Sequence, residues 1–227
     1  MKIALAGSLS LVLLSGCSSL GLDFSRMRGG EAPAPQAAGQ PETLYLDLIT
    51  GLRGRGLHRA ALAHLDEYER LYERTPATLL LRGQSLLDIR DDAAALEVFR
   101  QITSGPEAAA AQAGIGTAAA RIERWDLAVE AFTEAVRREP TNPRYLNNLG
   151  YALLRSGNAR EGEFRLRMAG ELDPNSAEIR NNLALLLLAT SRRPDGERLL
   201  ALMPSAEARA ALRREAAQIQ NPPERRS

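Results

Sequence analysis

The sequence is poor in cysteine, lysine and aromatic residues, and each shortage excludes a class of structure or partner. Cys17 is the only cysteine among 227 residues, so no disulfide can form within the chain. Lys2 is the only lysine beside 28 arginines, and the formal net charge is +1. A chain so close to neutral does not attract nucleic acid by bulk electrostatics. Aromatic residues make up 4% of the chain and β-branched residues are few, which favours helices packed through small side chains.

Patterns typical of catalytic and metal sites are also missing. The sequence has no HExxH motif, no glycine-rich phosphate loop and no serine elbow. His58 and His64 are six residues apart, so on a helix they point to different sides and form a poor metal pair. Asp91 and Asp92 lie at a predicted turn, where helix capping explains them. The sequence therefore predicts a protein that is not an enzyme, with no catalytic residues, no cofactor and no metal.

The N-terminus has the features of an export signal. Lys2 precedes an apolar run of 12 residues, 3–14, which suits a signal-peptide core and is too short to cross a bilayer as a helix. The run ends in LSGC at 14–17, which resembles the lipobox of bacterial lipoproteins. The resemblance implies that residues 1–16 are removed and that Cys17 is lipidated on its thiol and its new amino group. The alternative is an ordinary secretory cleavage site, at which Cys17 is merely a small residue.

Residues 17–41 carry glycine and proline signals and show no period. We expect a flexible tether behind the lipidated cysteine. Two or more acyl chains, as in lipoproteins, give a stable membrane anchor. Ser18 stands where enterobacterial lipoproteins of the inner membrane carry aspartate. The resemblance thus implies an outer-membrane protein on the periplasmic face.

From residue 42 to about residue 220 the apolar residues follow a helical period, and they also recur at a longer one. Gly116 and Gly150 are 34 residues apart, and so are Pro140 and Pro174. A fixed period of this order is typical of solenoids built from repeated supersecondary units. No stretch alternates in the manner of a β-strand. The sequence therefore predicts an all-α fold.

The repeated residues resemble the tetratricopeptide repeat (TPR), a unit of two helices joined by a turn. In the clearest unit they are Leu149, Gly150, Ala169 and Pro174. The resemblance implies a right-handed superhelix of about five units with a C-terminal capping helix. We place the units at 42–75, 76–108, 109–142, 143–176 and 177–204. A capping helix at 205–220 and a disordered tail at 221–227 complete the predicted organisation.

Small residues are expected where the two helices of a unit cross most closely. On this ground we pair Gly116 with Ala135, and Gly150 with Ala169. Trp125 begins a second helix, where packing between units is its expected role.

In the TPR family, the first helices of successive units line the concave face. The family's inward-pointing positions, carried onto this chain, predict a partner-binding groove lined by Leu80, Gln84, Leu87, Thr117, Arg121, Arg144, Asn147, Asn148, Tyr151, Leu154, Arg155, Asn181, Asn182 and Leu185. Asparagine can pair with a peptide backbone, the apolar side chains offer anchors, and arginine can hold a carboxylate. Two alternatives to this groove stay open. The first is that Asn148 and Asn182 only brace their own helices. The second is that Leu185 and Leu188 belong to the core beneath the terminal helix.

The runs NNLGYALL at 147–154 and NNLALLLL at 181–188 most resemble TadD, the lipoprotein of Tad (tight adherence, or Flp) pilus assembly. That resemblance implies a pilotin-like factor that binds the outer-membrane secretin of the pilus machine and helps it to reach or assemble in the membrane. The alternatives are a type IV pilus pilotin of the PilF/PilW group, the TPR lipoprotein of the β-barrel assembly machinery, and a general periplasmic scaffold.

Overall fold

The computed structural model describes residues 41–221, and all regular structure in that range is helical. The predicted signal peptide, Cys17 and nearly all of the tether lie outside the described residues, as does the tail from 222. The helices of the described range are α1 Pro41–Gly54, α2 His58–Leu71, α3 Pro76–Asp88, α4 Asp92–Phe99, α5 Ala108–Arg121, α6 Trp125–Arg138, α7 Pro143–Arg155, α8 Ala159–Leu172, α9 Ala177–Ala189, α10 Arg193–Leu200 and α11 Ala206–Gln220.

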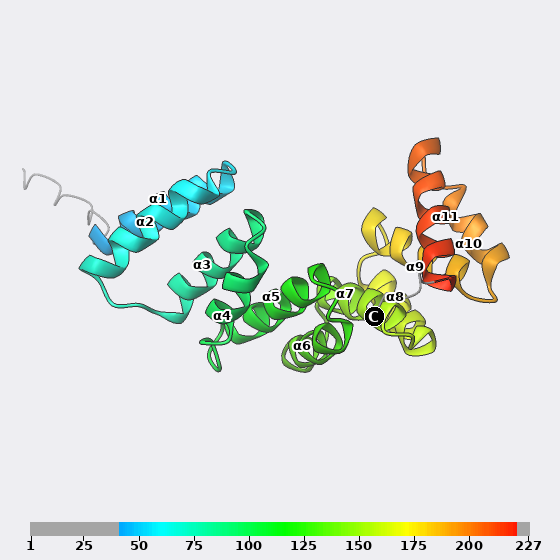
Figure 1. Ribbon diagram of the computed structural model, residues 1–227, viewed down its shortest axis with the longest axis horizontal. Helices are drawn as coiled ribbons and strands as arrows, with labels where there is room; N and C mark the ends of the chain where they lie inside the picture. Colours follow the sequence, from blue (N-terminus) through cyan, green and yellow to red (C-terminus); the bar gives the residue numbers. More distant parts are fainter. Residues whose placement is uncertain (1–40, 222–227) are drawn as a thin grey trace, which may run out of the picture. The chain divides into compact units, whose positions relative to one another are not determined.

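The first ten helices form five consecutive pairs, and an eleventh follows them (Figure 1). The helices of each pair pack together, and each second helix packs against the first helix of the next pair. Such stacking is required because a helix of about 12 residues is marginal alone and must bury its apolar stripe against a neighbour. The predicted all-α fold, with five two-helix units and a terminal helix, is confirmed.

Local hydrogen bonds explain why three of the first helices begin where they do. The side chains of Thr75, Asn142 and Ser176 each accept a hydrogen bond from a backbone N–H in the first turn of α3, α7 and α9. Asp91 caps α4 by accepting from the Ala94 N–H at 3.2 Å, which confirms its predicted capping role. The caps at Thr75, Asn142 and Ser176 thus mark the start of a unit through contacts within the first turn.

The turn inside each of the first four pairs uses one residue in the left-handed region. Gly56 and Gly157 hold this position in the first and fourth pairs, with φ of 75° and 93°. Arg90 and Glu123 hold it in the second and third, with φ of 67° and 58°. A side chain there costs roughly 1–2 kcal/mol per residue, so two of the four turns are strained.

The pairing of small residues at the helix crossings differs from the prediction. A Cβ on Gly150 would lie 2.6 Å from Leu166 Cγ and 3.0 Å from the Gly162 carbonyl oxygen. A Cβ on Gly116 would lie 2.7 Å from the Phe132 ring. The predicted partners Ala135 and Ala169 are wrong, because the helices cross one to two turns earlier in α6 and α8. Ala169 packs instead with side chains of α7 and α9.

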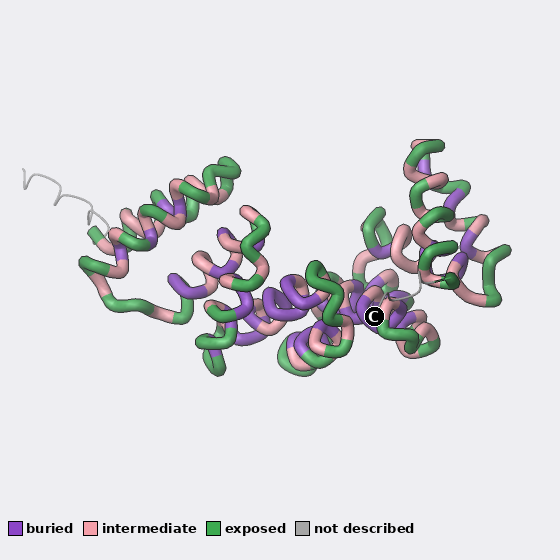
Figure 2. The backbone as a smooth tube through the Cα atoms, viewed as in Figure 1, coloured by how far each residue is buried: buried purple, intermediate pink, exposed green. Residues whose placement is uncertain are grey.

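The buried residues are distributed along all five pairs (Figure 2), and their side chains form successive apolar clusters. The fifth pair differs from the others because Leu185, Leu186, Leu187 and Leu188 are all buried on α9. The second half of α9 is therefore apolar all round and must be covered on every side. Among residues 41–221 we find no helix that combines the length and the apolarity needed to span a bilayer.

Candidate partner-binding site

An open pocket of about 340 Å³ lies where the third and fourth pairs meet. The end of α5, the start of α6 and the inner side of α7 form its walls. Its lining residues are Thr117, Ala120, Arg121, Glu123, Trp125, Phe132, Asn148, Tyr151 and Arg155. A concave, mostly apolar surface with a few convergent polar groups is the usual form of a binding site.

Two aromatic rings and one guanidinium dominate the pocket. Trp125 and Tyr151 meet edge to face, with ring centroids 5.9 Å apart. The guanidinium carbon of Arg155 lies 4.2 Å from the Trp125 ring centroid, a cation–π contact. Arg155 Nη1 also donates a 2.9 Å hydrogen bond to the Tyr151 hydroxyl. These contacts hold three large side chains in one arrangement, which lowers the entropy lost when a ligand binds.

The Tyr151 hydroxyl also connects the pocket to the end of the chain. It donates a 3.0 Å hydrogen bond to Glu215 Oε1 of α11. Burial and the neighbouring Glu215 carboxylate raise the pKa of Tyr151, while Arg155 opposes the rise. The hydroxyl therefore stays protonated and remains a donor at neutral pH.

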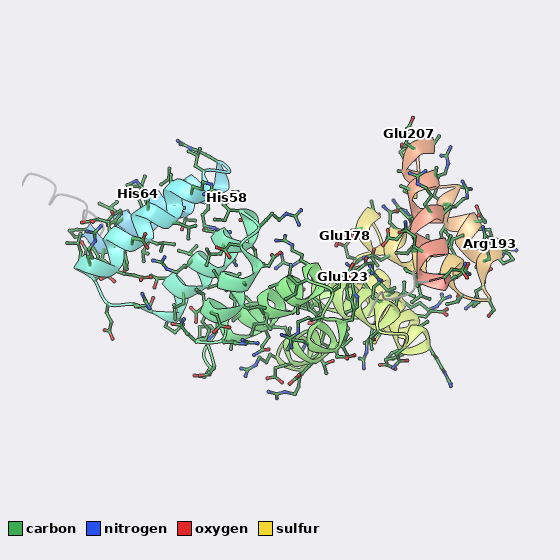
Figure 3. The ribbon with its side chains drawn as sticks, viewed as in Figure 1. His58, His64, Glu123, Glu178, Arg193 and Glu207 are labelled. Atoms are coloured by element: carbon green, nitrogen blue, oxygen red, sulfur yellow. The ribbon has the colours of Figure 1, made fainter. Side chains whose placement is uncertain are left out.

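The opposite rim of the pocket is braced by Arg121. Its Nη1 donates to the Leu87 carbonyl oxygen at 2.5 Å and to Asp92 Oδ1 at 3.1 Å, which joins the third pair to the second. Glu123, at the end of α5 in Figure 3, occupies one of the strained turn positions. Strained residues cluster at binding sites when the surrounding structure holds them.

Comparison with known proteins decides the family. A sequence profile described as Tetratricopeptide repeat matches residues 46–113 and 113–165. The chain belongs to the tetratricopeptide repeat family. It is 30% identical over 202 residues to TPR repeat-containing protein PA4299 of Pseudomonas aeruginosa, covering 88% of this chain and 78% of that one.

Solved TPR structures have the same fold. MamA from Desulfovibrio magneticus RS-1 is 22% identical with a TM-score of 0.63, covering 78% of this chain and 98% of that one. TTC0263 from Thermus thermophilus is 21% identical with a TM-score of 0.61, also covering 78% and 98%. YrrB, described as a TPR protein with an unusual peptide-binding site, is 18% identical with a TM-score of 0.60, covering 75% and 90%.

The TPR fold brings five of the predicted groove residues together in the pocket. They are Thr117, Arg121, Asn148, Tyr151 and Arg155. All five lie on α5 and α7, the first helices of two neighbouring TPR units, so their shared face follows from the repeat. Whether a partner binds them stays a prediction.

Four other predicted groove residues are buried, so their predicted exposure is wrong. Leu87, Leu154 and Leu185 are 9%, 3% and 2% exposed, and Asn147 is 1% exposed. The leucines belong to the apolar clusters of their TPR units. Leu185 and Leu188 share a cluster with residues of α11, so the alternative that they are core beneath the terminal helix is confirmed.

Both polar atoms of the buried Asn147 side chain form hydrogen bonds with neighbouring side chains. Its Nδ2 donates to Glu178 Oε1 at 3.1 Å, and its Oδ1 accepts from Asn182 at 2.9 Å. Both partners lie near the start of α9, where Figure 3 labels Glu178. Asn182 therefore ties the fifth TPR unit to the fourth, and its hydrogen bond reaches another helix rather than bracing its own.

The remaining predicted residues lie away from the pocket. Leu80 packs against the core of the second unit, and Gln84 accepts a 2.7 Å hydrogen bond from Arg53 of the first. Arg144 is exposed at the start of α7, and Asn181 lies near the start of α9. These four residues extend along the first-helix side without joining one site.

Four pocket residues were not among the predicted groove residues, namely Ala120, Glu123, Trp125 and Phe132. Trp125 packs between units as expected, because its ring contacts Tyr151 and Arg155 of the next unit, and it also forms a wall of the pocket. Glu123 was not singled out, although its place one period before Gly157 could have marked it as a strained turn residue. Glu123 lies in the turn and Trp125 begins α6, and the family's inward-pointing positions leave out both places.

The histidines take structural roles at the first two units. His58 Nδ1 lies 3.1 Å from Asp88 Oδ2, and the Tyr45 hydroxyl lies 3.3 Å from His64 Nδ1. Figure 3 labels both histidines on α2. In the described part of the chain, no group of three histidine, cysteine or acidic side chains is placed to hold a metal ion.

Proposed function

We propose that this TPR protein is a lipid-anchored, pilotin-like factor of the outer membrane. Cys17 carries the lipid, residues 18–41 tether the helical domain on the periplasmic face, and the domain binds a segment of an outer-membrane secretin in Tad (Flp) pilus assembly. The LSGC pattern at 14–17 supports the anchor, and the TadD-like runs at 147–154 and 181–188 support the assignment to this pilus.

The pocket formed by Trp125, Tyr151 and Arg155 is the observation that carries the binding role. Ring edges and faces accept an apolar or aromatic side chain, and the Asn148 amide can pair with a peptide backbone. Arg155 offers a positive charge beside them, suited to a carboxylate. The surface is therefore suited to a short peptide segment that places an apolar anchor next to an acidic group.

Binding can be measured directly because Trp125 is the only tryptophan. A synthetic secretin segment that enters the pocket should change its fluorescence, and titration gives the Kd. Arg155→Ala should weaken binding by about 1.5–3 kcal/mol if Arg155 holds a carboxylate, which is tenfold or more in Kd. Arg160→Ala is the matched control, since Arg160 is an exposed arginine on α8 outside the pocket, and it should leave Kd unchanged. Equal Kd values for the two variants would refute the site.

The anchor and the partner need a test in cells. Wild-type protein should incorporate labelled palmitate and fractionate with the outer membrane, and Cys17→Ala should do neither. Affinity capture of the wild type from solubilised membranes should recover the secretin. Recovery of cell-wall synthases without the secretin would favour the general periplasmic scaffold, and normal surface pili in the Cys17→Ala strain would remove the pilotin role.

A further inference from the structure

Helix α11 lies on the inner face of the last TPR unit. Leu212, Ala216 and Ile219 of α11 share one apolar cluster with Leu185 and Leu188 of α9. Residues 185 and 188 are one turn apart and form a single stripe on α9. This stripe is the one that the TPR resemblance predicts to face the groove.

The position of α11 differs from that of a sixth first helix. In the preceding units, α5, α7 and α9 pack against the second helix before them, namely α4, α6 and α8. In contrast, α11 packs mainly against α9. It also reaches past α9 to α7, because Glu215 accepts the hydrogen bond from Tyr151. The last helix therefore covers the groove side of α9 instead of extending the stack.

Few buried apolar contacts attach α11 to this face of α9. Ala216 is the only buried residue among the 15 of α11, whereas α9 has six buried residues. Polar contacts at the rim supply much of the remaining attachment. Arg213 pairs with Glu197 at 2.6 Å, and Gln220 Nε2 donates to the Leu188 carbonyl oxygen at 3.3 Å. Elements with few buried apolar contacts open at a lower free energy than the core around them.

The side-chain oxygen of Asn181 on α9 lacks a hydrogen-bond donor among the described residues. Asn147, at the same place in the fourth unit, is paired through both its oxygen and its nitrogen with the following unit. Asn181 Oδ1 is buried at the atomic level and has no donor among the described residues. Asn181 lies one turn before Leu185 on the same stripe. A buried amide oxygen without a donor is costly, so a donor brought to this position would be stabilising.

We propose that the stripe of Asn181, Leu185 and Leu188 is a second partner-binding surface, with α11 as its displaceable occupant. The incoming partner is an amphipathic helix of the protein bound under the proposed function, on which this inference rests. Its pattern follows α11: aliphatic residues at the places of Leu212, Ala216 and Ile219, and a carboxylate at the place of Glu215. A donor near its N-terminus would satisfy Asn181, and side chains larger than alanine would fill the stripe better.

Tyr151 couples this surface to the pocket. Its ring forms a wall of the pocket, while its hydroxyl holds α11 through Glu215. A ligand that draws Arg155 or Tyr151 toward itself weakens that hydrogen bond and favours release of α11. A partner with both an anchor peptide and an amphipathic helix would thus bind in two linked steps.

The test uses the full chain and a fluorescein-labelled synthetic peptide with the sequence of residues 206–220. The variant Leu212→Ser/Ile219→Ser loosens α11 and substitutes no residue of α9 or of the pocket lining. Fluorescence anisotropy should give at least tenfold tighter peptide binding to this variant than to the wild type, whose own α11 competes. Arg214→Ala, an exposed change on α11, should bind as the wild type does. A peptide carrying Leu212→Asp should bind neither protein.

Equal peptide affinity for the loosened variant and the wild type would overturn the proposal. Hydrogen exchange on the wild type provides a second measurement that needs no variant. Amides of 206–220 should exchange at least tenfold faster than those of 177–189, and a common rate would show that α11 opens only with the whole domain. A dimer of the wild type exchanging α11 between copies would also overturn it in favour of a second copy as occupant.

Failure of this inference is distinguishable from failure of the proposed function. Recovery of the secretin by wild type and loosened variant in equal amounts would refute the displaceable helix and leave the pilotin role standing. Tight peptide binding by the loosened variant, with no secretin recovered by either protein, would support the second surface and refute the secretin as partner.

Discussion

The contact between Gly150 and Gly162 provides a sharp test of the packing. Helices α7 and α8 approach so closely there that a Cβ on Gly162 would lie 2.8 Å from the Gly150 carbonyl oxygen. The same Cβ would lie 3.2 Å from Leu186 Cδ1 and 3.3 Å from the Leu154 nitrogen. Two of these three neighbours are backbone atoms, so no side-chain rotation can make room. We predict that Gly162→Ala destabilises the domain.

The magnitude follows from two opposing effects. Replacing glycine by alanine inside a helix stabilises it by about 1 kcal/mol. Forcing an extra methyl into a close-packed contact costs about 1–3 kcal/mol, and the upper half of that range applies where backbone must move. The expected net loss is about 1–2 kcal/mol, and for a domain of this size each kcal/mol lowers Tm by about 2–4 °C.

Gly51→Ala is the matched control. Gly51 lies inside α1, and a Cβ there would meet nothing within 4 Å. The helix-propensity effect then acts alone, so this variant should gain about 0.5–1 kcal/mol. Both variants can be compared with the wild type by circular dichroism in urea and on heating. A Gly162→Ala protein as stable as Gly51→Ala would refute the close crossing of α7 and α8.

Three further predictions concern a strained turn, a buried tyrosine and the hold on α11. Arg90→Gly should stabilise the domain by about 1 kcal/mol in urea denaturation because it relieves a non-glycine φ of 67°; an unchanged midpoint would argue against the strain. Burial and the hydrogen bond to Glu42 raise the pKa of Tyr68 from 10.0 to about 12. The folded pKa lies above the unfolded one, so this stabilisation is complete below pH 10 and is lost as the pH rises toward 12. Tyrosinate absorbance and circular dichroism should show that step, and Tyr68→Phe should remove it. Tyr151→Phe removes the hydrogen bonds to Arg155 and Glu215, at a cost of about 1 kcal/mol, and should speed hydrogen exchange in 206–220 but not in α1; unchanged exchange would show that Glu215 does not hold α11.

The helical units were predictable because their signals are local. Thr75, Asn142 and Ser176 cap the helices that they immediately precede, and the period of 34 residues repeats the same short-range pattern. The repeat also predicts that Arg121, Asn148 and Tyr151 share one face of α5 and α7, and they line the same pocket. Such features depend on residues a few positions apart, and the chain carries them in any folded context.

The exposed surface depended on packing between distant segments, which the repeat does not encode. Leu185 is inaccessible because α11 turns back over α9, and Tyr151 meets Glu215 across 64 residues of sequence. Gly150 faces Gly162 because of where α7 and α8 cross, and Trp125 enters the pocket because the start of α6 borders the next unit. Periodicity specifies which side of each helix is apolar. The tertiary packing specifies which helix covers that side, and so which part of the inner face is open to a partner.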